Sequence, residues 1–198
     1  MKNDSSYSLS RKDYYERLVT PKNVSFFNDL RKDQKGMLRI DIPVIFRDLH
    51  FGASPRQASP LLGEPRYVVE SSGISSRIFF YKESISNHRI ITQLHFLNEE
   101  FFYACYSFRH TTPAETASIR KLLFEKYSKM NGDTAEKYDH MIDSDNNVIR
   151  VYDNVNFNIV YLWGNNKVAD AVASHIRSAQ RRQEIKVWSK VEDLRNKL

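Results

Sequence analysis

The sequence predicts an α+β fold in which helices pack on an antiparallel sheet, and three observations support that prediction. The chain has 198 residues, of which 41% are hydrophobic and 13% aromatic, enough to form the core of one compact domain. Short runs of β-branched and aromatic residues alternate with turn-forming residues. Two predicted helices begin at recognisable caps, and each precedes a group of such runs.

The N-terminal segment is expected to contain helices before the first strand. Residues 11–19 are predicted to form one short helix. Thr20 followed by Pro21 is typical of an N-cap and a first helical residue, which predicts a second helix ending near Gly36. From residue 37 to residue 51 the pattern becomes β-like.

A first unit of helix and meander is predicted after this segment. Ser54 and Gln57 have the spacing of a capping box, in which each side chain satisfies a backbone N–H at the helix start. Gly63 and Pro65 are expected to end this helix. Short links between the β-rich runs that follow favour an antiparallel meander, and the runs cover residues 67–69, 77–82, 89–97 and 101–108.

The same plan occurs a second time along the chain. Thr112 and Glu115 form a second capping box, which begins a helix that is expected to end near Gly132. The face of this helix predicted to be buried consists of Ile119, Leu122, Leu123, Tyr127 and Met130. Three further β runs follow, over residues 137–142, 148–152 and 157–163.

The predicted architecture is therefore two helix-plus-antiparallel-meander units that form a sheet packed by helices, with additional N- and C-terminal helices. The boundaries are expected to separate an N-terminal helical extension and lead-in strand, two units and a C-terminal basic helix. In order, these parts cover residues 1–50, 51–110, 111–165 and 166–198, within one compact domain.

The C-terminal segment from Lys167 to Leu198 lacks glycine and proline and is predicted to be one long helix. Its apolar residues are spaced for one side, which is expected to pack back on the body of the protein. Self-association through this helix, giving a homo-oligomer, is the alternative. The spaced residues are Val187, Val191, Leu194 and Leu198.

The net charge is +6, and the basic residues gather towards both ends of the chain. Such ends attract phosphates or an acidic partner, so the C-terminal helix is a candidate for nucleic-acid or other anion binding. The alternative is that these residues simply solvate the helix. The candidate anion-binding residues, predicted to lie along one side of the helix, are Arg177, Arg181, Arg182 and Lys186.

Residues 51–65 carry a motif with Gly52, Ser54 at the helix cap, Gly63 and Pro65. This motif resembles the Gly-x-Ser/Thr … Leu-Gly-x-Pro signature of the SmpA/OmlA and β-lactamase-inhibitor-protein-like domains. The resemblance implies a short helix that leads into a β-meander, two such units in tandem, and binding of another protein through a concave sheet. It implies no catalysis.

The alternation of side chains along the strands predicts two faces of the sheet. One face is expected to lie under helices and to include Ile78, Phe80, Ile90, Leu94, Phe96, Phe102, Ala104, Tyr106 and Phe108. The other face mixes aromatic rings with polar groups, as contact surfaces often do. We take it as a candidate partner-binding surface, with burial under the C-terminal helix as the alternative. Its residues are Arg77, Phe79, Tyr81, Gln93, His95, Phe101 and Tyr103, together with Cys105 and Ser107.

No catalytic, metal or cofactor site is predicted. The six histidines include no His-x-x-x-His pair. Asp143, Asp145 and Asn147 resemble the start of a calcium loop, but Val148 stands where that loop needs glycine, so a hairpin turn is expected. Cys105 is predicted to be a buried, inert thiol within a strand.

The sequence therefore predicts a non-enzymatic protein-binding or assembly module. A nucleic-acid or anionic-partner binder is the alternative, and a small enzyme with a pocket near His95 or Cys105 is a further one. A cytoplasmic location is expected, since the chain shows no apolar run long enough for a signal or a membrane span and has one cysteine.

Overall fold

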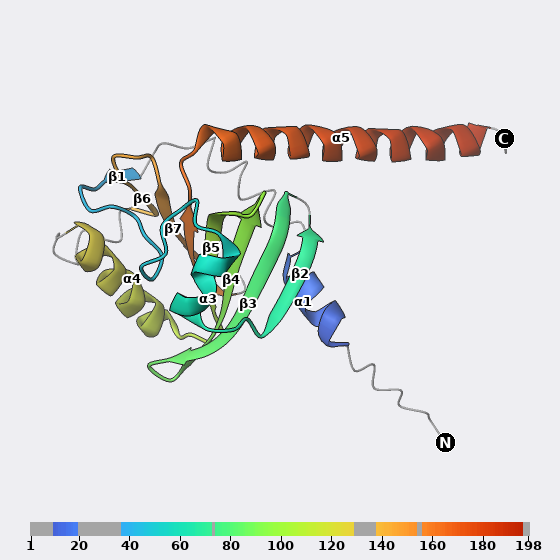
Figure 1. Ribbon diagram of the computed structural model, residues 1–198. Helices are drawn as coiled ribbons and strands as arrows, with labels where there is room; N and C mark the ends of the chain where they lie inside the picture. The colour runs from blue at the N-terminus through green and yellow to red at the C-terminus, as the bar shows by residue number, and fades with distance from the viewer. Residues whose placement is uncertain (1–9, 20–36, 73, 129–137, 154–155, 196–198) are drawn as a thin grey trace, which may run out of the picture.

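The computed structural model describes residues 10–19, 37–72, 74–128, 138–153 and 156–195 (Figure 1). It is a mixed α+β structure built on one eight-stranded sheet, as the sequence predicts. The helices are α1 (Arg11–Val19), α3 (Pro55–Leu62), α4 (Pro113–Ser128) and α5 (Asn166–Arg195). The strands are β1 (Met37–Arg39), β2 (Tyr67–Ser72), β3 (Ser75–Ile85), β4 (His88–Leu97), β5 (Glu100–Phe108), β6 (His140–Ile142), β7 (Val148–Asp153) and β8 (Phe157–Leu162).

The strands lie in the order β1-β6-β7-β8-β5-β4-β3-β2. Strands β2 to β5 pair with their successors in antiparallel fashion, and so do β6 to β8. The two groups join where β8 pairs with β5, also antiparallel. Only the short β1 is parallel to its neighbour, β6, among the paired strands described. Each strand run predicted from residue 67 onward matches a strand, with bounds that differ by a few residues.

Both predicted capping boxes are confirmed. The backbone N–H of Ser54 donates to Oε1 of Gln57 at 2.8 Å, and that of Thr112 donates to Oε2 of Glu115 at 2.7 Å. Helix α3 ends at Gly63, whose φ of +78° lies in the region that glycine tolerates best. The starts of both helices can be predicted from the sequence because each capping box depends only on two residues that are three positions apart.

The buried side of α4 differs in part from the prediction. Leu122 is 65% exposed, whereas Leu123, Phe124 and Tyr127 are buried. One residue along a helix turns the side chain by about 100°, so the true face runs through Phe124 and leaves Leu122 in solvent. Met130, which was also predicted to be buried, lies outside the described residues.

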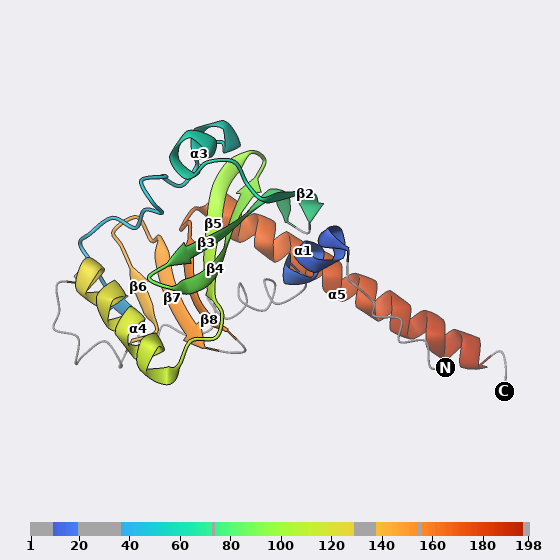
Figure 2. The same cartoon turned by 90° about the horizontal axis from the view of Figure 1, so that it is seen from below.

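Helices cover both faces of the sheet (Figure 2). Helices α3 and α4 contribute Ala58, Leu123, Phe124 and Tyr127 to the largest apolar cluster, on the face we call the α3/α4 face. On the opposite α1/α5 face, Tyr15 of α1 packs on strands β2 to β4. Val168, in the first turn of α5, packs on the same face over β5 and β8.

The predicted division of strand residues between the two faces is wrong in β3. Residues that lie directly opposite in an antiparallel pair share a face. Ile78 pairs with His95 and Phe80 pairs with Gln93. Ile78 and Phe80 therefore lie on the α1/α5 face, away from Ile90, Leu94 and Phe96, with which they were grouped.

A β-bulge in β5 accounts for a second difference. Phe96 pairs with Phe101, but the next pair is His95 with Tyr103, so Phe102 is the extra residue. The bulge moves Phe101 to the α3/α4 face and Phe102 to the α1/α5 face, the reverse of the prediction. The simple alternation on which the prediction rests fails at one inserted residue.

Residues 37–51 contain less strand than predicted. Only Met37–Arg39 forms a strand, and the rest is irregular apart from one bridge between Phe46 and Leu49. The two residues between them, Arg47 and Asp48, have φ values of +49° and +62°, as a tight reversed turn requires. The helix predicted from Pro21 to about Gly36 lies outside the described residues.

Helix α5 confirms the long C-terminal helix, but the expectation that it packs back on the body is wrong for most of its length. Asn165 caps it by accepting the Lys167 N–H at 2.8 Å. Val168 is 3% exposed, whereas from Arg177 onward every side chain that the structure describes is exposed. A helix of 30 residues is about 45 Å long, and most of it extends beyond the sheet (Figure 1). No helix in the described part of the chain combines the length and apolar character of a membrane span.

Candidate functional site

A cleft of about 400 Å³ lies where the β3–β4 turn, the end of β5 and the start of α4 meet. The turn places Ser86 and Asn87 in left-handed conformations, with φ values of +46° and +67°. Two residues with positive φ match the twist of the flanking strands, so the turn is tight and the first residues of β4 are held at its base. The cleft is lined by Ser86, Asn87, His88, Arg89, Arg109, His110 and Glu115.

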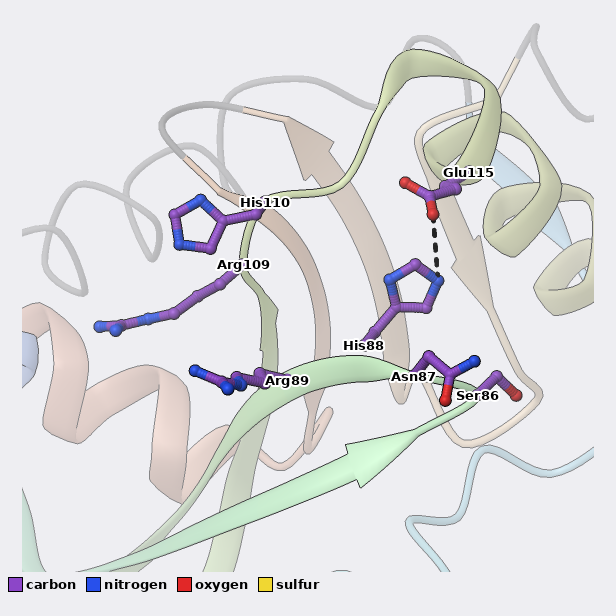
Figure 3. A pocket seen from close by; sticks show the side chains of 7 residues that line it. All are labelled: Ser86, Asn87, His88, Arg89, Arg109, His110 and Glu115. Atoms are coloured by element: carbon purple, nitrogen blue, oxygen red, sulfur yellow. Dashed lines mark ion pairs between the residues drawn. The ribbon is translucent and has the colours of Figure 1, made fainter.

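Two arginines lie side by side in this cleft. Ile90 pairs with Phe108, and the Arg109 N–H donates to the Arg89 carbonyl at 3.3 Å. The two arginines are therefore opposite each other, with Arg89 in β4 and Arg109 directly after the end of β5. Figure 3 shows both side chains, with that of His110, projecting to the same side of the ribbon. The Arg109 guanidinium also lies over the Tyr14 ring of α1, 5.5 Å from its centroid.

The other wall of the cleft carries Glu115, the only carboxylate among the lining residues that the structure describes. His88 Nε2 lies 3.9 Å from Oε1 of Glu115, the ion pair drawn in Figure 3. The other oxygen of Glu115 accepts hydrogen bonds from the N–H and the hydroxyl of Thr112, and these bonds lower the pKa of Glu115. The carboxylate of Glu115 therefore interacts with Thr112 at the helix cap and with His88, and it forms no ion pair with Arg89 or Arg109.

Six of the seven residues predicted to bind a partner are buried and divided between the two faces. Gln93, His95 and Tyr103 lie on the α1/α5 face, and Phe79, Tyr81 and Phe101 lie on the α3/α4 face. Each of these six is at most 7% exposed. The prediction that these six residues share one open face is therefore wrong. The side chains of β3 point to the opposite faces from those predicted, and the bulge in β5 moves Phe101 to the other face.

The seventh residue, Arg77, is partly exposed and forms ion pairs with Glu70 at 3.2 Å and Glu99 at 3.3 Å. The guanidinium of Arg77 is therefore already paired with two carboxylates of the same chain. A buried side chain contacts a partner only after local opening of the fold. The exposed surfaces of the molecule are consequently better candidates for binding than the predicted face.

On the α1/α5 face, both ring nitrogens of His95 lie near polar atoms of buried side chains. Nδ1 of His95 lies 2.9 Å from the Ser75 hydroxyl, and its Nε2 lies 3.3 Å from Oε1 of Gln93. The Tyr103 ring meets the imidazole edge-on, with centroids 4.8 Å apart. Burial lowers the pKa of His95 to about 3, so the ring is neutral at physiological pH.

Cys105 is buried, as predicted, and burial raises the pKa of its thiol to about 11. Only the thiolate reacts quickly with disulfide reagents, and at pH 8 about one thiol in a thousand is then ionised. We expect the folded protein to react with a chromogenic disulfide orders of magnitude more slowly than the same protein in denaturant. The chain has one cysteine, so the colour released reports Cys105 alone. Equal rates in both conditions would contradict this placement.

The residues predicted to bind anions on α5 are all exposed, but they do not form one row. Arg177 and Arg181 are four residues apart and share a side, as do Arg182 and Lys186. The step from Arg181 to Arg182 turns about 100° around the helix. The prediction of a single basic side is therefore wrong, and α5 carries two basic pairs on different sides.

Sequence reasoning missed an exposed apolar group on α5. Trp188 is 73% exposed and Ile185 is 61% exposed. Their spacing of three residues places them on one side of the helix, the same side as Arg177 and Arg181. We call these four residues the Trp188 face. The spacing was visible in the sequence, but the exposure depends on where the helix leaves the body.

The described residues contain no group of three or more His, Cys, Asp or Glu side chains that could hold a metal ion. The cleft is lined by neither His95 nor Cys105, around which an enzyme pocket was considered. Comparisons with protein-family models, with curated proteins and with solved structures give no match for this chain.

Proposed function

We propose that this chain is a non-enzymatic binding protein that engages an acidic protein partner through the Trp188 face of α5. The observation that carries the proposal is the exposure of Trp188, at 73%, on a helix that extends beyond the sheet (Figure 1). Tryptophan is enriched among the residues that dominate binding energy at protein interfaces. A large ring left in water on an extended helix gains most from a partner that covers it.

The arrangement of the Trp188 face suits recognition of the helix by a groove. Ile185 and Trp188 form adjacent apolar anchors, and Arg181 lies one turn before Ile185 on the same side. Helix-in-groove recognition uses apolar anchors at this spacing, with charged residues at the rim. The long stem of Arg181 adds apolar contact, and its guanidinium can pair with a carboxylate of the partner.

The charge of this part of α5 favours an acidic partner over a second copy. Between Arg177 and Trp188 the helix has four basic residues and one acidic residue, Glu184. Two copies that met through this segment would bring like charges together, which opposes association. A partner with carboxylates around an apolar groove would complement both features.

The proposal is tested by placing a photo-cross-linking residue at position 188 or at position 187 of the full chain. Val187 is 55% exposed but lies about 100° around the helix from Trp188, so it is a matched control. In lysate of the source organism, we expect the probe at 188 to capture one acidic protein and the probe at 187 to capture little of it. The captured protein is then purified for affinity measurement.

With that protein, the variant Trp188→Ala is expected to bind at least about 30-fold more weakly, since a central tryptophan contributes about 2 kcal/mol or more. Val187→Ala is expected to bind like the wild type. Equal affinity of the two variants would refute the Trp188 face as the binding surface. A cross-link from position 188 to a second copy or to nucleic acid would refute the acidic protein partner.

The tandem organisation remains part of the proposal. We propose that α3 with β2–β5 and α4 with β6–β8 are two units of the kind implied by the resemblance to SmpA/OmlA and β-lactamase-inhibitor-protein-like domains. The capped helix before each antiparallel group supports it. Binding through α5 differs from what that resemblance implies, because the sheet residues first considered are buried.

A further inference from the structure

We propose that the cleft beside the β3–β4 turn binds the phosphate group of a small phosphomonoester, with Arg89 and Arg109 as its main ligands. The turn lies at the opposite end of the sheet from α5 (Figure 1), so this site is separate from the Trp188 face. A cleft of about 400 Å³ is within the range of small-molecule sites and is larger than a phosphate alone needs.

The first argument is the placement of two like charges. Arg89, in β4, and Arg109, directly after β5, are opposite each other and are joined by the backbone hydrogen bond of 3.3 Å. Like charges directly across an antiparallel pair destabilise the sheet. Neither arginine forms an ion pair with a carboxylate in the described part of the chain. An anion between the two guanidinium groups would remove this repulsion and accept several charge-assisted hydrogen bonds.

The second argument is that the surroundings add donors and few competing acceptors. His110 projects to the same side as the two arginines (Figure 3), and its φ of +59° turns the chain sharply after β5. Ser86 and Asn87 line the other part of the cleft, away from the two guanidinium groups (Figure 3), where the group attached to the phosphate would lie. Glu115, the one acidic residue in the described lining of the cleft, already accepts hydrogen bonds from Thr112 and lies beside His88.

The third argument is that the positions are rigid. Arg89 lies in β4 and Arg109 directly follows β5, and both of these central strands are paired on both sides. Arg109 is held against the ring of Tyr14, which restricts its side chain. A site built on paired strands loses less conformational freedom on binding than one built on a loop. The group attached to the phosphate would occupy the remaining volume of the cleft, toward His88.

The test is a titration of the ¹⁵N-labelled full chain with adenosine monophosphate, inorganic phosphate and adenosine, at constant ionic strength set by sodium chloride. We expect adenosine monophosphate to shift the amide signals of residues 86–89, 109–112, 114 and 115, inorganic phosphate to shift them at higher concentration, and adenosine to leave them unchanged. No shift with adenosine monophosphate, or an equal shift with adenosine, would overturn the proposal. Binding of inorganic phosphate alone would overturn its phosphomonoester part.

The variant Arg89→Gln tests the ligand assignment. Arg89 is exposed, so this variant is expected to fold, and loss of one charged donor pair is expected to weaken binding about tenfold or more. Arg56→Gln, at another exposed arginine on α3, is expected to bind like the wild type. Without ligand, Arg89→Gln is expected to keep or raise the melting temperature, since it relieves the repulsion. Unchanged affinity, or a lowered melting temperature, would contradict the role of Arg89.

Discussion

Replacing Asp143 by alanine is expected to lower the free energy of unfolding by about 4 kcal/mol, which is much of the stability of an ordinary domain. Asp143 is buried in the turn between β6 and β7, and its carboxylate accepts four hydrogen bonds. Oδ1 accepts from the N–H groups of Asp145 at 2.9 Å and Asn147 at 2.8 Å. Oδ2 accepts from the Val44 N–H at 2.8 Å and the Asn147 amide at 3.0 Å.

The loss of stability should be large because the hydrogen bonds of the β6–β7 turn join distant parts of the chain, at a point we call the Asp143 junction. Val44 lies 99 residues before Asp143. Oδ1 of Asn147 accepts the Gly164 N–H at 3.0 Å, which ties the turn to the segment that leads into α5. Gly164 approaches so closely that a Cβ there would lie 2.2 Å from the Asn146 carbonyl oxygen. Alanine at 143 leaves four donors unsatisfied at this packed point.

Urea denaturation of purified variants measures the loss. Asp145→Ala is the matched control, because Asp145 is exposed in the same turn and is expected to change stability by less than about 0.5 kcal/mol. Asp143→Asn keeps one acceptor oxygen and is expected to fall between the two. If Asp143→Ala and Asp145→Ala unfold at the same urea concentration, the buried carboxylate does not stabilise this junction.

The same residues show how far sequence reasoning reaches. The pattern of Asp143, Asp145 and Asn147 was interpreted as a hairpin turn, and the turn is confirmed. The contact of Asp143 with Val44 is not predictable, because Val44 lies in the irregular segment after β1, whose path depends on the finished sheet. Local signals, such as the capping boxes at Ser54 and Thr112, are predicted correctly because the partners in each box are only three residues apart.

The faces of the sheet were harder to predict because both faces are buried. In β4, every residue from Ile90 to Phe96 is buried, so hydrophobic alternation cannot tell one face from the other. The register with β3 and the bulge at Phe102 decide the faces, and both are set by pairing between strands. The juxtaposition of Arg89 and Arg109 depends on the same pairing, which is why the cleft was absent from the sequence prediction.

His95 illustrates a buried residue whose main effect is on stability, and it leads to a prediction about pH. Burial lowers the pKa of His95 from 6.5 to about 3 in the folded protein. The imidazole therefore stays neutral in the folded state while it takes up a proton in the unfolded state below pH 6.5. The contribution of His95 to the free energy of unfolding is therefore fully present above pH 6.5 and is lost as the pH falls toward 3.

The expected loss is on the order of 5 kcal/mol over the whole interval from pH 6.5 to about 3. Nδ1 of His95 lies 2.9 Å from the Ser75 hydroxyl and Nε2 lies 3.3 Å from Oε1 of Gln93. A hydroxyl that donates to Nδ1 and an Nε2–H that donates to Gln93 satisfy both atoms of the neutral ring. Protonation would remove the acceptor that Ser75 needs and place a charge among Tyr103 and other buried groups.

The measurement compares the wild type with His95→Gln, which has no proton to gain, by urea denaturation at a series of pH values. Near pH 7 the variant is expected to be less stable, because glutamine fills the ring's site poorly and loses the contact with Tyr103. As the pH falls toward 3, the wild type should lose its advantage, since only its unfolded state gains the histidine proton. Carboxylates titrate in both proteins, so their contribution cancels in the difference. A difference in unfolding free energy that stays constant with pH would show that His95 is not held neutral by burial.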